Sequence, residues 1–164
     1  MSIYLGLNER VKEFDSKHGG EPVVVGHWLL FPDGAQREAN PMGAWIDPPP
    51  KPYERAQLIV RYHEERLRRA TQTFDELKET LRRQASEAIR QAGAPTPPQP
   101  PGEAQLAELR VMQETVFERG KARDEAVAAA EQLKPLKYRE REANAAVNAA
   151  AGQAALEAIS SIKV

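Results

Sequence analysis

A long run without a helix breaker, from Pro52 to Ala92, limits the folds that this chain can adopt. Pro52 suits the first position of a helix, and Gly93 is expected to cap its C-terminal end. Apolar side chains recur along the run in steps of four and three, which predicts one long helix with a heptad seam. The seam consists of Ala56, Val60, His63, Leu67, Ala70, Phe74, Leu77, Leu81, Gln84 and Ala88.

A helix of this length does not fit inside a small globular core. At ~1.5 Å per residue it would be roughly 60 Å long, so we expect a rod or one arm of a bundle. Two seam positions, His63 and Gln84, are polar. A polar seam residue either fixes the register of a coiled coil or marks a part of the seam that is exposed, and both interpretations stay open.

Two further helices are predicted after a proline-rich linker at residues 94–102. The linker is interpreted as a spacer, with a ligand for a proline-recognising domain as the alternative. One helix should run from Glu103 to Lys134, where Pro135 either kinks or ends it. The next should run from Leu136 to about Ile162, with a narrow seam of small residues that permits close helix packing. That seam consists of Ala143, Ala146, Val147, Ala150, Ala154, Ala158 and Ile162.

Residues 1–51 differ in kind from the rest and are treated as an N-terminal module. They hold both tryptophans and six of the ten glycines. Leu7, Val11 and Phe14 lie at helical spacing, which indicates a short helix before the Gly19-Gly20 break.

The only β-rich run of the chain, Val23 to Phe31, lies in this module. Turn residues around Gly34 separate it from a polar arm at residues 35–39, which predicts a β-hairpin. The first strand would be apolar on both faces, and no third strand is expected to cover it. Because a lone hairpin is marginal in water, we expect it to dock on a partner chain. The docking residues would be Val24, Trp28 and Leu30.

The segment from Asn40 to Pro52 is predicted to be an extended connector, because each residue before a proline disfavours α geometry. The chain thus divides into residues 1–51, the long helix at 52–93, the linker at 94–102 and Ala-rich helices at 103–164. The predicted fold class is mainly α: a long helical hairpin or a coiled-coil bundle with a small N-terminal β-hairpin module. The pattern leaves open whether the helices fold back or extend.

Charge and composition narrow the classes of function. The 23 basic and 24 acidic residues nearly cancel, so no overall field would attract nucleic acid or an anionic membrane. The absence of cysteine excludes disulfides and thiolate chemistry. No signal-peptide pattern and no apolar stretch of ~20 residues is present. We therefore expect a protein of the cytoplasm or of the interior of a virion.

No residue pattern indicates a catalytic centre, a cofactor or a metal. His18, His27 and His63 fall on different predicted elements without a further ligand at zinc spacing. An Arg-rich stretch from Arg61 to Arg69 suggests phosphate binding, but acidic residues three or four positions away favour a solvated helix surface.

The sequence is therefore interpreted as a non-enzymatic structural or adaptor subunit of a multi-chain assembly, such as a phage particle component or an accessory subunit of a bacterial complex. The helical arm would mediate assembly through other protein chains, in a homo- or hetero-oligomer. Two alternatives are a nucleic-acid-associated accessory protein and a regulator that inserts the hairpin into a partner. The expected assembly residues of the long helix are Val60, Leu67, Phe74, Leu77 and Leu81.

Overall fold

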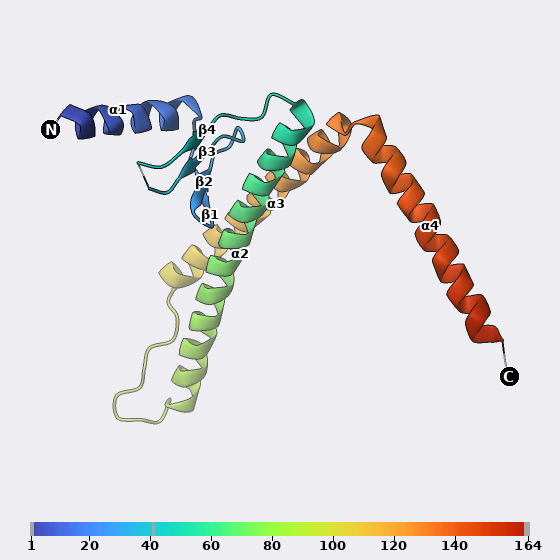
Figure 1. Ribbon diagram of the computed structural model, residues 1–164. Helices are drawn as coiled ribbons and strands as arrows, with labels where there is room; N and C mark the ends of the chain where they lie inside the picture. Colours follow the sequence, from blue (N-terminus) through green and yellow to red (C-terminus); the bar gives the residue numbers. More distant parts are fainter. Residues whose placement is uncertain (1, 41, 163–164) are drawn as a thin grey trace.

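The computed structural model describes residues 2–40 and 42–162, and it shows a mainly α-helical chain with a small N-terminal sheet (Figure 1). The predicted fold class is confirmed. The elements in chain order are α1 (Ser2–Lys17), β1 (Val23–Val25), β2 (Trp28–Leu30), β3 (Gln36–Glu38), β4 (Trp45–Ile46), α2 (Pro52–Arg90), α3 (Glu103–Leu133) and α4 (Leu136–Ser161).

The β-rich run forms two strands and not one. Gly26 adopts a φ of +62° and turns the chain between β1 and β2, which pair antiparallel. A positive φ costs little for glycine, and glycine at the first turn position is typical of a tight hairpin. The predicted pairing with the polar arm is present, because Leu30 of β2 pairs with Gln36 of β3.

A fourth strand lies in the segment that was predicted to be an extended connector. Trp45 of β4 pairs with Arg37 of β3, which gives an antiparallel sheet in the order β1-β2-β3-β4. The expectation that the chain offers no third strand is therefore wrong. Hydrophobic alternation could not reveal β4, which has only two residues. Pro41, part of the predicted connector, lies outside the described residues.

One helix packs on each face of the sheet. Phe14 of α1 lies against Trp45, with ring centroids 5.6 Å apart. Tyr62 of α2 packs on the other face, against the buried side chains of Val23 and Leu30. The run is thus apolar on both faces because each face meets a helix of the same chain. α1 of the same chain packs on the second face.

The long helix and the one after it form an antiparallel hairpin (Figure 1). Every predicted seam residue of α2 is buried or half-buried, as expected for a face that packs on α3. Gln84 of the seam and Gln105 of α3 exchange side-chain amide hydrogen bonds, at 3.2 and 3.5 Å. Of the two interpretations left open for Gln84, register fixing fits this pair.

The ends of the hairpin helices differ slightly from prediction. α2 ends at Arg90, and Gln91 takes the capping position, where its N–H donates to the Glu87 carbonyl. Gly93 does not adopt the left-handed conformation of a glycine cap. The prediction of a Gly93 cap is therefore wrong, because the chain leaves the helix two residues earlier and forms turns before Pro95.

Pro135 ends a helix and does not merely kink it. α3 stops at Leu133, and α4 starts at Leu136 in a new direction, so that it projects from the hairpin as an arm (Figure 1). All residues of α4 are solvent-exposed. The described chain thus consists of a sheet module, a helical hairpin and an arm.

Candidate protein interaction surfaces

The assembly residues predicted on α2 lie where α3 packs. Leu81 is 5% exposed, and Val60, Leu67, Phe74 and Leu77 are half-buried. A two-helix hairpin covers a seam from one side only, which explains why most of these side chains keep contact with water. Their burial here is explained by the chain's own hairpin, and a role in binding other chains stays a prediction.

The docking residues predicted in the N-terminal module are separated by the fold. Leu30 is 2% exposed and belongs to the chain's own core, where it packs with Tyr62. Trp28 is half-buried, and Val24 is 40% exposed. The Arg69 guanidinium of α2 donates a hydrogen bond of 2.6 Å to the Val24 carbonyl. This contact occupies a backbone acceptor of β1 that strand addition would need.

A polar cluster that the sequence did not reveal joins α1 to the sheet module. His18 is 4% exposed, and its Nδ1 lies 2.5 Å from Asp33 Oδ2. Its Nε2 lies 3.3 Å from Asp47 Oδ1. Arg37 and Asp15 form a second, bidentate pair at 2.9 and 3.1 Å. The partners are 15 to 29 residues apart, so no local spacing could have indicated them.

The contacts of this cluster hold elements of the fold together. Asp33 also accepts the Ala35 N–H at 2.9 Å, a contact within the turn that was predicted around Gly34. Its other oxygen ties the turn to α1 through His18. Within the described residues, no group of three or more histidine, aspartate or glutamate side chains is placed to hold a metal ion.

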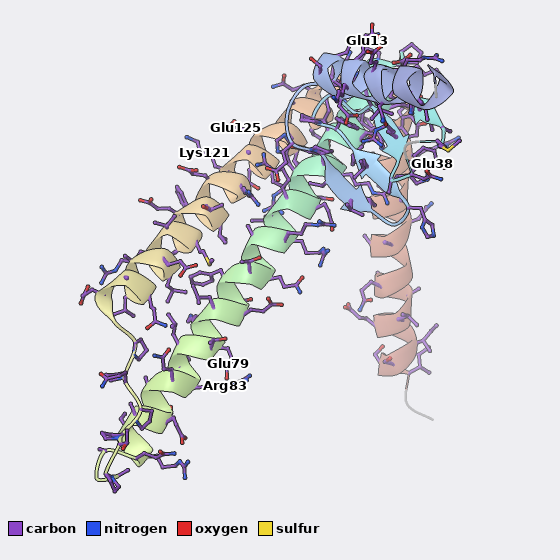
Figure 2. All side chains as sticks on the ribbon, turned by 90° about the vertical axis from the view of Figure 1, so that its left-hand side faces the viewer. Glu13, Glu38, Glu79, Arg83, Lys121 and Glu125 are labelled. Carbon is purple, nitrogen blue, oxygen red and sulfur yellow. The ribbon has the colours of Figure 1, made fainter. Side chains whose placement is uncertain are left out.

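The Arg-rich face of α2 carries the intrahelical ion pairs that its spacing predicts. Glu65 lies 2.6 Å from Arg68 and 3.2 Å from Arg69, and Arg68, by hydrogen bonding, holds the pKa of Glu65 below its ordinary value. Glu79 and Arg83 form a similar pair at 3.3 Å on the outer side of α2 (Figure 2). Such pairs neutralise part of the charge that a phosphate backbone would need.

The arm is held to the hairpin by specific contacts at the elbow between α3 and α4. The rings of Tyr53 and Tyr138 lie with centroids 5.5 Å apart. The Arg139 guanidinium donates to the carbonyls of the last turn of α3, at 3.2 and 3.4 Å. Lys134 forms an ion pair with Glu142 that includes a side-chain hydrogen bond, and this bond raises the pKa of Lys134 above its ordinary value. These contacts fix the direction in which α4 leaves the hairpin.

The arm itself exposes aliphatic side chains, of which only Val147 and Ile162 belong to the seam predicted for this helix. Val147, Leu156, Ile159 and Ile162 are 67%, 61%, 65% and 73% exposed. At 3.6 residues per turn, Val147 lies on the opposite side of the helix from Leu156. From residue 143 to residue 162 the only charged side chain is Glu157. A helix apolar on more than one side is typical of the interior of a bundle.

A groove between α2 and α3 exposes a further aromatic side chain. Phe117 is 74% exposed, and Gly120 beside it would place a Cβ only 3.9 Å from Leu67. Lys121 and Glu125 border the groove on the outer side of α3 (Figure 2). The fold thus places Phe117 outside the hairpin interface. The groove lining is Leu67, Val116, Phe117, Gly120, Lys121, Asp124, Glu125 and Ala128.

Comparisons with protein-family models, with curated proteins and with solved structures find no significant match to this chain. In the described part of the chain, no helix combines the length and the apolar character needed to span a bilayer. We therefore infer the function from the surfaces described above.

Proposed function

We propose that this protein is a non-catalytic structural or adaptor subunit whose helical arm joins it to other protein chains. The observation that carries the proposal is the arm, which is entirely exposed and nearly free of charge from residue 143 to residue 162. Exposed apolar surface of this extent is rare on monomeric soluble proteins and marks sites of association.

The elbow supports the same proposal. Tyr53 with Tyr138, and Arg139 with the α3 carbonyls, hold α4 in one direction before any partner binds. A preorganised arm loses less conformational freedom on association than a flexible one, so more of the contact energy appears as affinity. A phage particle or a bacterial complex is a setting that such a subunit would fit.

The experiment compares the size of the native assembly for two versions of the full chain. The tagged wild-type protein, produced in cells of its source, should elute from a size-exclusion column far above its own mass of 18.3 kDa. A variant with Val147→Asp and Leu156→Asp places a charge on each side of the arm and should elute much later. Elution of the wild-type chain at the mass of one chain would refute the proposal.

A further inference from the structure

One face of the arm turns toward the hairpin. Residues at heptad spacing share this face, which we call the inner face of α4: Tyr138, Ala145, Ala149, Gly152, Leu156 and Ile159. Tyr138 fixes its direction, because its ring lies against that of Tyr53 on α2. Leu156 and Ile159 extend the inner face toward the C-terminal end of α4, where they are 61% and 65% exposed.

The groove with Phe117 lies on the same side of the hairpin as the arm. Tyr53, Val60 and Leu67 follow one another at seven-residue steps along α2, so they lie on nearly the same side of that helix. Tyr53 meets the arm, and Leu67 lines the groove. The molecule therefore carries an apolar helix and an apolar groove on one side, and the arm does not occupy its own groove (Figure 1).

The elbow explains why the arm stays out of its own groove. Folding α4 back along α3 would change the angle at Pro135 and break the contacts of Tyr138, Arg139 and Lys134. These contacts bridge α4 to α3 and to the start of α2. The groove remains accessible to another molecule.

We propose that α4 of one copy packs in the Phe117 groove of a second copy, whose own α4 packs in the groove of the first. This inference rests on the proposed function and names its partner. The contact is isologous, because each copy contributes one arm and one groove to a two-fold symmetric dimer.

The available area favours this exchange over pairing of two arms alone. A helix of 26 residues is about 39 Å long and about 10 Å wide, so one of its sides presents roughly 400 Å². Arm-to-arm pairing would bury about that area on each chain, which is the size of a weak contact. In a reciprocal exchange each chain buries part of its groove as well as its arm. The exchange therefore buries up to twice the area of arm-to-arm pairing, at most about 800 Å² on each chain, which is the size of a stable interface.

Shape and charge agree with a second copy as the occupant. The groove presents one large side chain, Phe117, beside the small Gly120 and Ala128. The inner face presents small residues in its middle and two large ones, Leu156 and Ile159, toward its end. Large and small side chains can therefore interdigitate. Between residues 143 and 162 Glu157 is the one charged side chain, so little like-charge repulsion opposes packing of this part of the arm on an identical chain.

The test measures the mass of the purified full chain by light scattering over a wide range of concentrations. The wild-type protein should have twice the mass of 18.3 kDa. Phe117→Asp in the groove, or Leu156→Asp with Ile159→Asp on the arm, should halve the mass. Two matched controls carry the same charge at exposed valines on other sides of the same helices: Val111→Asp on α3 and Val147→Asp on α4. Both should keep the mass of the dimer.

Mixing the two broken variants gives a second readout. In an exchanged heterodimer, the intact arm of the Phe117→Asp chain meets the intact groove of the other chain, so the mixture should recover part of the dimer that neither variant forms alone. Recovery would not follow from misfolding of either variant.

Three results would overturn the exchange. A wild-type chain with the mass of a monomer at every concentration excludes it, while the larger native assembly could still support the proposed function. A dimer that Phe117→Asp leaves intact shows arm-to-arm pairing. Loss of the dimer in both control variants shows that the added charge acts without regard to its position.

Discussion

Tyr53 at the start of α2 and Tyr138 in the first turn of α4 pack with ring centroids 5.5 Å apart, although 84 residues separate them in the chain. Arg139, the next residue, donates hydrogen bonds to the carbonyls of Glu131 and Gln132 at the end of α3. Pro135 has no N–H to donate to the end of α3, and the Lys134 N–H donates to the Glu131 carbonyl at 3.3 Å. The Arg139 guanidinium adds a second donor to Glu131 and supplies one to Gln132. The direction of the arm thus depends on two neighbouring side chains.

We expect Tyr138→Ala combined with Arg139→Ala to free the arm without unfolding it. The chain has no cysteine, so Asp75→Cys and Gln153→Cys provide unique sites for spin labels on α2 and α4. The distance distribution between the labels, measured with an excess of unlabelled chain, should become clearly broader. Tyr138→Phe keeps the ring and should leave the distribution narrow. An unchanged distribution in the double alanine variant would show that Pro135 and the remaining ion pair of Lys134 with Glu142 are enough to set the angle.

Removal of one hydroxyl should weaken the packing of the sheet on α2. Tyr62 is 2% exposed, and its hydroxyl donates a hydrogen bond of 2.5 Å to the Glu21 carbonyl. Burial also raises the pKa of Tyr62, so the group remains a neutral donor. Tyr62→Phe should lower the free energy of unfolding by about 1–2 kcal/mol in urea titration. The half-buried Tyr53, changed to Phe, serves as the control, and an equal loss there would contradict the assignment.

The seam of α2 should be far more sensitive to charge than its outer face. Leu81 is 5% exposed, so Leu81→Asp removes apolar burial and leaves an unpaired carboxylate. The free energy of unfolding should fall by about 2–5 kcal/mol. Arg82→Gln, at the neighbouring exposed position, should change the free energy of unfolding by no more than about 0.5 kcal/mol. Leu67→Asp and Leu77→Asp, at half-buried positions, should cost less than Leu81→Asp. If the arginine change were the more damaging, the charged face would be the functional one, and the nucleic-acid alternative would gain support.

Stability should decline in mild acid through His63. Its pKa lies below the ordinary 6.5, first because burial disfavours the imidazolium and second because the Arg66 guanidinium repels it. As the pH falls below about 6.5, the unfolded chain binds the proton before the folded chain does. The free energy of unfolding therefore falls between that pH and the lower folded pKa, and levels off below it.

Thermal unfolding at a series of pH values tests this contribution. His63→Gln cannot take up the proton, so its melting temperature should fall less between about pH 7 and pH 5 than that of the wild-type chain. His27→Gln, at an exposed position, should follow the wild-type curve. Identical pH dependence of the His63 variant and the wild-type chain would show that other groups cause the decline.

Local pattern was enough to predict most of the helical architecture. The run from Pro52 shows its heptad seam in residues three and four positions apart, and helical backbone bonding joins residues over the same short range. Pro135 and the prolines between residues 94 and 102 interrupt that bonding wherever they stand, so the segment boundaries were within two residues of those observed. Interactions between residues close together in the sequence are enough to produce these features.

The helices, their breaks and the seam on α2 could thus be predicted from the sequence, because they depend on neighbouring residues. The fold was needed to show that Gly26 splits the β-rich run, that α1 packs on the second face of the sheet, and that Gln84 contacts Gln105. It was also needed to show that Leu30 is a core residue and that Phe117 and the arm are exposed. Each of these depends on contacts between residues far apart in the chain, whose energies favour one arrangement of the elements without leaving a periodic trace in the sequence.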